Sequence, residues 1–387
     1  MKNKFWLLCS LLVLFATSKA EDDAKFKVLP MGRVLIDGAF YASPDKDVFK
    51  NGMAIPEARL GAKFYYGKWS SWIDVGFAYG KIGLRNMWIQ YDFNDHHSVR
   101  AGNYLQPFGY QSPTTTNNKP TFEQPLASAL YTPGLQLGAM YTFNNPSFYS
   151  ATAFHVESSA LTNVMNYPDF NQQGFTLLER FVWRQKDSGK EGNPIIQAGI
   201  SLGYSTPDRH LIDDKDVHSG FTNTALFPSK VNPTTALSAV IGDARLRFKL
   251  SPELVMAYKR IALESQYFFQ TIARKDNARA FNSQSAYVTL RGIIIGGNYS
   301  YDPKIANLVN PKKHALECVM DYNYANLSDA KAGIFGGRAN SFNVTFNYYF
   351  NAYITARLNY SYTHVWDRGN EPSLTQNAFQ LRLMLLF

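Results

Sequence analysis

The sequence predicts an all-β protein, a transmembrane antiparallel β-barrel of about 16 strands with a constriction loop folded inward. Two observations carry this prediction. Segments of about ten residues, in which polar and apolar side chains alternate, recur along the chain and are separated by turn residues. Aromatic residues make up 15% of the chain, with 24 Tyr and 28 Phe, while the mean hydropathy of -0.25 is too low for helical membrane spans.

Residues 1–20 have the features of a secretory signal peptide. Lys2 and Lys4 precede the apolar run FWLLCSLLVLFA, and the tripeptide SKA that ends at Ala20 has the small-x-small form of a cleavage site. The run of about 12 residues is shorter than the ~20 that span a bilayer as a helix, although a retained anchor is the alternative. We expect an exported chain whose residues 21–387 form an outer-membrane barrel domain.

The segments NSFNVTFNYYFN and AYITARLNYSYTH form the clearest predicted hairpin. In the first segment Phe342, Val344 and Phe346 alternate with Asn343 and Thr345, so one face is apolar and the other polar. Together with the terminal strand QNAFQLRLMLLF, the other predicted strands lie near residues 31–41, 54–66, 69–79, 82–93, 97–104, 134–143, 148–156, 175–185, 194–204, 242–257, 261–273, 284–299 and 313–325.

The predicted connections alternate between short and long. Short turns at residues 66–68, 94–97 and 144–146 are interleaved with long connections at 105–133 and 205–239. An outer-membrane barrel has this asymmetry, with tight periplasmic turns and longer outer loops. A soluble all-β protein is the alternative, but its apolar faces would meet in a core and would not be bounded by tyrosine and phenylalanine girdles.

The last strand needs a partner along its whole length. Leu381, Leu383 and Leu385 lie on one side, and Gln380 is among their alternate neighbours. An unpaired strand edge in hydrocarbon leaves backbone groups without partners, at a cost of several kcal/mol each. We therefore expect this strand to pair with the first strand up to Phe387 and so to close the barrel.

Basic residues are predicted to point into the lumen, because the apolar residues of each strand face lipid. Three of them, in the segment DARLRFKL, occupy alternate positions of one strand and would form a row along the lumen that stabilises an anion at successive steps. The alternative is that the arginines only avoid lipid and pair with Asp92, Glu264, Glu317 and Asp321. The predicted inward cations are Arg59, Arg100, Arg245, Arg247, Lys249, Arg291, Arg357 and Arg382.

The segment NYLQPFGYQSPTTTNNKPTFEQPLASALYTPGLQLG is the predicted constriction loop. Its prolines stiffen it, and long loops without regular structure are usually functional. We expect it to fold into the barrel and to set a size limit, whereas the alternative is an ordinary loop at the outer surface. The residues assigned to the constriction are Tyr104, Gln106, Lys119 and Glu123.

Three stretches, GRVLIDGAFY, LRNMWIQYDFNDHHSVRAGNYLQPFG and LYTPGLQLGAMYTF, resemble the phosphate-selective porin O/P family. The resemblance covers most of the chain after the signal. It implies a barrel of sixteen strands, a homotrimer, an arginine ladder along the lumen and lysines at the constriction. Arg33, in the segment MGR, matches a position of that ladder.

The chain departs from the family at two places. Where the family has an arginine pair before Ala-x-Leu, this chain has Pro56 and Glu57, so that Arg59 stands alone. Where the family has a lysine in Gly-x-Phe-Lys-x-Pro-Phe, this chain has Leu105, which cannot contact phosphate as a charged donor does. The resemblance therefore implies an anion channel without strict phosphate selectivity.

The function expected from the sequence is passive diffusion through an anion-preferring pore of the bacterial outer membrane, with phosphate or polyphosphate as candidate ligands. A general non-selective small-solute pore is the alternative. A channel for hydrophobic compounds is a further one, although the inward Arg, Asn, Thr and Gln residues oppose it. The expected partners are outer-membrane lipid, lipopolysaccharide and small anions.

Other functions find little support in the sequence. No histidine lies in a nucleophile motif, so we expect no enzyme. His96 and His97 beside Asp95 supply too few ligands for a closed metal site, and we expect neither a metal nor a cofactor. The net charge of +9 comes from basic residues that are scattered singly, which does not predict nucleic-acid binding.

Overall fold

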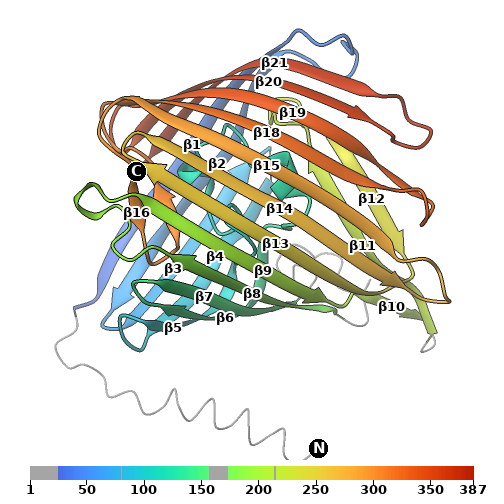
Figure 1. Cartoon of the computed structure of the whole chain (residues 1–387), viewed down its shortest axis with the longest axis horizontal. Coiled ribbons are helices and arrows are strands. Elements are labelled where there is room, and N and C mark those ends of the chain that lie inside the picture. The colour runs from blue at the N-terminus through green and yellow to red at the C-terminus, as the bar shows by residue number, and fades with distance from the viewer. Residues whose placement is uncertain (1–24, 80, 157–172, 213–214) are drawn as a thin grey trace, which may run out of the picture.

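The computed structural model describes residues 25–79, 81–156, 173–212 and 215–387. The predicted signal peptide therefore lies outside the described residues. Sixteen antiparallel strands form a closed barrel, as the sequence predicts (Figure 1). Around the wall they are β1 (Lys27–Tyr41), β2 (Gly52–Tyr66), β3 (Trp69–Ala78), β4 (Lys81–Asp92), β5 (His97–Leu105), β6 (Leu135–Asn144), β7 (Phe148–Val156), β8 (Phe175–Arg184), β9 (Ile195–Ser205), β13 (Ala244–Tyr258), β14 (Ile261–Arg274), β15 (Phe281–Ile295), β18 (Ala315–Asp329), β19 (Ile334–Tyr349), β20 (Ile354–Trp366) and β21 (Leu374–Leu386).

The first and last strands close the barrel. β1 pairs with β21 from Arg33 opposite Leu386 to Tyr41 opposite Ala378. The backbone of Phe387 continues the ladder, because its N–H donates to the Gly32 carbonyl at 3.1 Å and its carbonyl accepts from Gly32. The predicted pairing of the terminal strand is confirmed, and both strands have hydrogen-bonded partners at this seam.

Alternation places apolar side chains on the outside of the wall. In β19 the side chains of Phe342 and Phe346 are exposed, while Asn343 and Thr345 between them are buried toward the interior. The exposed aromatic and aliphatic residues suit a barrel whose outer surface meets lipid. Among the described residues, no helix is long and apolar enough to cross a bilayer.

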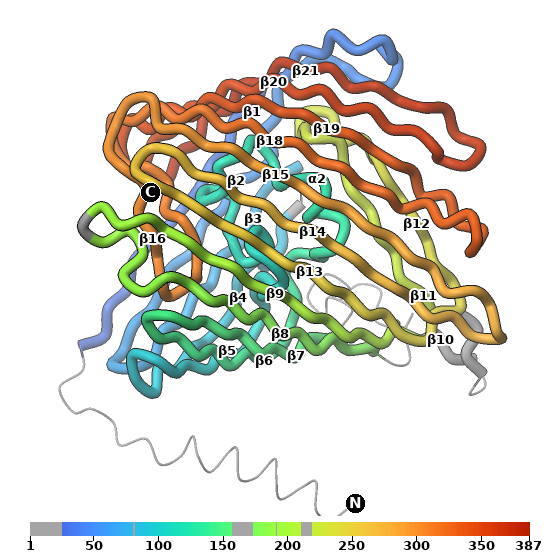
Figure 2. The backbone as a smooth tube through the Cα atoms, in the orientation of Figure 1, coloured from blue at the N-terminus to red at the C-terminus, as the bar shows by residue number. Residues whose placement is uncertain are grey.

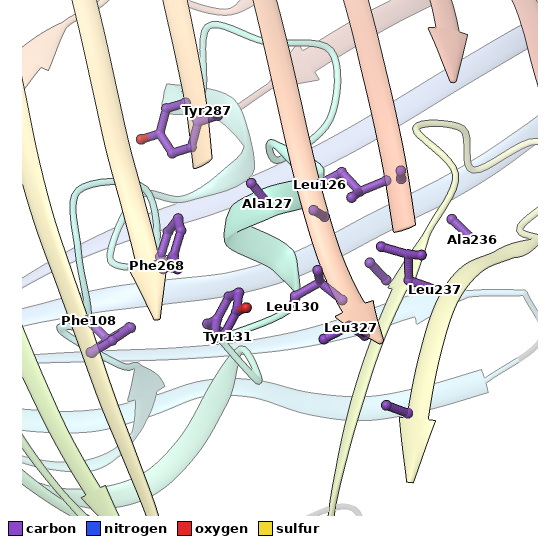
Figure 3. Packing of buried hydrophobic residues seen from close by; sticks show 14 of the residues in the cluster. Phe108, Leu126, Ala127, Leu130, Tyr131, Ala236, Leu237, Phe268, Tyr287 and Leu327 are labelled. Carbon is purple, nitrogen blue, oxygen red and sulfur yellow. The ribbon is translucent and has the colours of Figure 1, made fainter. Parts of the chain in front are cut away.

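The connection between β5 and β6 folds into the barrel, as predicted (Figures 1 and 2). It carries two short helical turns, η1 (Thr116–Asn118) and α2 (Leu126–Ala129). Leu126 and Leu130 from this loop, together with Tyr131, pack against the inner face of the wall (Figure 3). The ring of Tyr131 stacks on Phe268 of β14, with centroids 5.2 Å apart. The hydrophobic core of this protein therefore lies inside the barrel.

The long connection predicted at residues 205–239 lies between β9 and β13 and has regular structure of its own. It folds into a three-stranded sheet of β10 (Arg209–Ile212), β11 (Lys215–Leu226) and β12 (Thr235–Gly242). β12 packs against β18 and β19. The tip of the β11–β12 hairpin reaches β1, where Tyr41 Oη and Ser229 Oγ lie 2.5 Å apart.

The connection between β15 and β18 also differs from expectation. β15 ends at Ile295, four residues before the predicted end of that strand, and is followed by a small hairpin of β16 (Ser300–Asp302) and β17 (Asn307–Val309). This hairpin turns inward, since Asn307 Nδ2 donates to Thr114 Oγ1 of the inserted loop at 2.6 Å. The inserted β5–β6 loop and this hairpin thus occupy the interior from the two ends of the barrel.

A third short helical turn, η3 (Lys190–Gly192), lies between β8 and β9.

Candidate functional site

Two arginines and two carboxylates gather on the inner face of β1, β2 and β3. Arg33 lies opposite Arg59 in register, and Glu57 forms ion pairs with both: its Oε1 contacts Arg33 Nη2 and lies 2.6 Å from Arg59 Nε. Arg59 Nη1 lies 3.5 Å from Asp74 Oδ2. Gly61 faces Asp74, and a Cβ at Gly61 would lie 2.6 Å from the Cβ of Asp74, so glycine lets Asp74 approach the pair.

The inserted loop contacts this charged cluster. Arg33 Nη1 donates to Asn117 Oδ1 at 2.8 Å, and Thr116 Oγ1 donates to Glu57 Oε2 at 3.4 Å. Because these two loop residues belong to η1, the first helical turn of the loop is held directly over the arginines. The wall and the loop therefore form one site.

A cavity of ≈ 110 Å³ lies between the loop and the wall. Three of its lining residues are cationic, seven carry hydroxyl or amide groups from the loop or neighbouring strands, and two are leucines. The lining residues are Arg33, Arg59, Asn86, Leu105, Ser112, Thr114, Thr115, Thr116, Lys119, Gln124, Thr132, Gly134 and Leu135. Such a lining offers hydrogen-bond donors and positive charge to an anion.

Lys119 is the loop's own cation in this cavity, outside the sixteen membrane-spanning strands. Its Nζ donates to the carbonyl of Gln111 at 2.6 Å. Burial is the main reason that the pKa of Lys119 falls to about 7, and the charge of Lys230 lowers it further, while Glu123 and Glu264 raise it. The charge of this lysine therefore changes near neutral pH.

Arg100 on β5 extends the basic wall. Its Nε and Nη2 donate to Gln90 Oε1 at 3.0 and 2.6 Å, and its guanidinium lies 4.1 Å from the ring centroid of Trp88. Tyr104 follows on the same strand, with its ring 5.6 Å from that guanidinium and 5.0 Å from the ring of His155. Tyr104 was expected in the constriction loop and instead belongs to the wall.

Other predicted inward cations hold the loop in place. Arg357 donates to the carbonyls of Thr121 and Lys119 at 3.0 and 2.8 Å, and Arg382 donates to the carbonyl of Phe122 at 2.6 Å. Lys249 donates to the carbonyl of Tyr131 at 3.0 Å. These side chains are almost fully buried, so they face inward as predicted but contact the loop more than open lumen.

Two predicted loop residues take part in this anchoring. Glu123 contacts Arg382 Nη2, and its Oε2 lies 3.3 Å from Lys230 Nζ at the tip of the β11–β12 hairpin. Gln106 donates to Gln136 of β6, and its carbonyl accepts from Ser112 Oγ at 2.8 Å. Both residues fix the path of the loop.

The expected row of three cations on β13 is wrong at its first member. Arg245 is the extra residue of a β-bulge between Ala244 and Leu246, and its side chain is exposed. The bulge shifts the alternation by one position, so Arg247 and Lys249 face inward while Arg245 does not. Arg247 Nη2 donates to Ser205 Oγ at 3.2 Å under the β11–β12 hairpin, whose Phe221 ring lies 4.1 Å from its guanidinium.

The alternative prediction, in which the inward arginines pair with inward acids, is confirmed in part. Arg291 lies 2.6 Å from Glu264 and 2.8 Å from Glu317, so this arginine is neutralised. Asp321 accepts from the side-chain amides of Asn323 and Asn343, at 2.5 and 3.1 Å. Asp92 accepts from Gln90 at 2.7 Å.

Sequence reasoning missed two buried arginines on β8. Arg180 forms an ion pair with Glu253 at 2.7 Å, and Arg184 Nη1 donates to the carbonyl of Pro303, beside the β16–β17 hairpin, at 2.7 Å. The signal was available, because in FTLLERFVWR both arginines alternate with exposed Phe181 and Trp183. The hairpin that they contact was not predicted.

The two sides of the inner wall differ in exposure. On β14, β15, β18 and β21 the inward polar residues are covered by the loop and the hairpins. On β2, β4 and β5 several inward side chains keep partial exposure, among them Arg59, Lys63, Trp88 and Arg100, and Arg85 is exposed. The accessible part of the interior therefore runs along the side of the barrel that carries the charged cluster.

Within the described ranges, no three His, Cys, Asp or Glu side chains gather as a metal site requires.

The family model of phosphate-selective porin O and P matches residues 32–387. The chain belongs to this porin family. It is accordingly an outer-membrane channel of bacteria and not an enzyme.

Solved porin structures share the fold at low sequence identity. The trimer form of OmpT from Vibrio cholerae is 11% identical, with 94% of this chain and 99% of that chain covered and a TM-score of 0.54. An anion-selective porin from Comamonas acidovorans is 10% identical, with 94% and 100% covered and a TM-score of 0.56. The outer-membrane channel DcaP of Acinetobacter baumannii is 12% identical, with 94% and 97% covered and a TM-score of 0.56. No curated protein matches the sequence.

Proposed function

We propose that this porin is a passive, water-filled channel with a preference for anions. Anions pass along the accessible side of the interior, past Arg100 and then the cavity lined by Arg33, Arg59 and Lys119. The observation that carries the proposal is this convergence of three cations from two wall strands and the loop on one cavity. Positive charge in a narrow, partly dehydrated passage favours anions over cations.

Strict phosphate selectivity is not part of the proposal. Leu105 lines the cavity where the family has a lysine, and Glu57 occupies a position of the family's arginine pair. Both changes remove positive charge from the site. The channel that fits this lining is one for small anions in general, which bind weakly and leave readily.

The inserted loop is proposed to set the size limit of the pore. Lys119 and three neighbouring threonines line the cavity, while Glu123 and Gln106 hold the loop to the wall and to the β11–β12 hairpin. Prolines in the loop and its hydrogen bonds to Arg357 and Arg382 resist its displacement. A firmly held loop gives a constant opening.

The cellular setting of the proposal follows the family. The barrel is inserted among outer-membrane lipid and lipopolysaccharide after a signal peptide is removed near Ala20, and three copies assemble as a homotrimer. The trimer form of OmpT, which shares the fold, supports this assembly. Chemical cross-linking of the purified protein in detergent tests it, since a trimer gives a ladder that ends at three subunits.

The zero-current potential of the purified porin in a planar bilayer under a KCl gradient tests the proposed selectivity. A potential of the sign set by chloride supports the proposal. Equal permeability of chloride and potassium identifies a general non-selective pore, and a potential set by potassium contradicts the role of the cations. Added phosphate that blocks the chloride current at low concentration would show a selectivity for phosphate that the proposal excludes.

A further inference from the structure

The carboxylate of Glu57 occupies the place between two arginines where a permeating anion would otherwise bind. It lies 2.6 Å from Arg59 Nε, contacts Arg33 Nη2, and is itself buried. Two oppositely charged partners at this distance interact strongly in a partly buried site. Glu57 therefore acts toward the arginines as an anion that is tethered to the wall.

Other nitrogen atoms of both arginines also have polar partners near this carboxylate. Arg33 Nη1 donates to Asn117 of the loop, and Arg59 Nη1 faces Asp74. Of the charged residues in this cluster and its cavity, Arg33, Arg59 and Lys119 are positive, while Glu57 and Asp74 are negative. With Lys119 protonated, the site holds an excess of one positive charge.

We propose that Glu57 sets the valence selectivity of the pore, so that the cavity accepts monovalent anions, such as a halide or a small monocarboxylate, and disfavours multivalent ones such as sulfate or phosphate. A monovalent anion neutralises the excess charge of the site. A divalent anion adds a negative charge that is not compensated and that Glu57 repels at short range. The inference rests on the proposed anion preference and names the class of anion.

The lining beyond the charges agrees with a monovalent organic or inorganic ion. Thr114, Thr115 and Thr132 line the cavity with uncharged hydroxyl groups, whose protons are donated within the loop. Leu105 and Leu135 supply an apolar edge. A lining with few cations suits a monovalent ion, whereas a multivalent phosphate is bound best by several cationic donors. The cavity of ≈ 110 Å³ admits only a small solute.

The test compares the wild-type porin with Glu57→Gln in planar bilayers bathed in KCl, with sulfate as the probe because it is divalent throughout the neutral range. We expect sulfate to block the chloride current of E57Q at a concentration at least about tenfold lower than that for wild type. Glu57→Asp keeps the charge and should behave as wild type. Glu371→Gln removes a carboxylate from an exposed connection and should leave the block unchanged.

The outcomes are separable from those of the proposed function. Anion preference without any change of sulfate block in E57Q overturns the role of Glu57 and leaves the anion channel intact, whereas cation preference of the wild type overturns the channel proposal itself. If E57Q fails to insert into the bilayer, a measurement on the wild type alone still tests the inference. Reversal potentials in chloride and sulfate gradients should give a clearly lower permeability for sulfate, and equal permeabilities would overturn the inference.

Discussion

Arg59 Nε lies 2.6 Å from Oε1 of Glu57, two positions earlier on the same strand and on the same inner face of the barrel. Residues at i and i+2 of a strand project to one side, so the pair is a direct product of the alternation of side chains along β2. The same carboxylate reaches Arg33 on the neighbouring strand. The three side chains form a unit whose charge is available to the adjacent cavity.

Arg59 should carry a large part of the anion preference. Replacing it with Glu places three carboxylates around the cavity, and the chloride-to-potassium permeability ratio should fall several-fold. The matched control is Arg245→Glu, because Arg245 is exposed at the β-bulge and outside the row. Zero-current potentials of the two variants in one KCl gradient check this, and an equal fall in both would show that only the total charge matters.

The loop should limit conductance. Shortening residues 114–122 removes Lys119 and three of the four threonines that line the cavity, and single-channel conductance should rise because the opening widens. The control is a shortened connection at residues 367–373 between β20 and β21, outside the inserted loop. If both variants conduct as wild type does, the loop does not form the narrowest part of the pore.

Selectivity should depend on pH through Lys119. With a pKa of about 7, its amine is mostly protonated at pH 6 and mostly neutral at pH 8, so the anion preference should fall as pH rises across this window. Lys119→Gln should show the lower preference at both values. A wild-type pH dependence that persists unchanged in K119Q would assign the titration to another group.

Arg382 should stabilise the barrel as well as the loop. Its Nη2 lies 2.6 Å from Asp37 Oδ2 and contacts Glu123, so Arg382→Gln leaves the buried Asp37 without its cation and Glu123 with Lys230 alone. The expected loss of stability is about 3–5 kcal/mol. It should appear as a lower midpoint of heat-induced unfolding in detergent. Arg368→Gln breaks the ion pair with the exposed Glu371 and should cost under about 1 kcal/mol.

The β16–β17 hairpin should obstruct part of the interior. Residues 303–310 accept hydrogen bonds from Arg180 and Arg184 and donate to the inserted loop. Replacing residues 299–310 with a two-residue Asn-Gly turn should raise single-channel conductance by opening a second route beside β8. Unchanged conductance would mean that the hairpin covers space that ions do not use.

Much of the architecture could be predicted from the order of residues alone. Alternation with a period of two identifies each strand and its inner face, as in the segment around Phe342 and Asn343. The apolar terminal strand requires a partner, which predicts closure at Phe387. The proline-rich segment after Leu105 predicts a loop with a role inside the barrel.

Only the tertiary structure decides what each inward residue contacts. Arg357 and Arg100 have the same pattern in sequence, yet Arg357 is covered by loop carbonyls and Arg100 keeps partial exposure. A β-bulge turns the side chain of Arg245 away from the interior. The local sequence does not predict this bulge, because an extra residue is defined only relative to the partner strand.

The position of Glu57 between two arginines shows the same division. Alternation predicts that Glu57 and Arg59 share an inner face, since both lie on one strand. The position of Arg33 opposite Arg59 depends on the register between β1 and β2. The contact of Asn117 with Arg33 depends on a loop that comes from far along the chain. Local patterns determine which side a residue faces, and contacts between distant segments determine whether its charge is free to act.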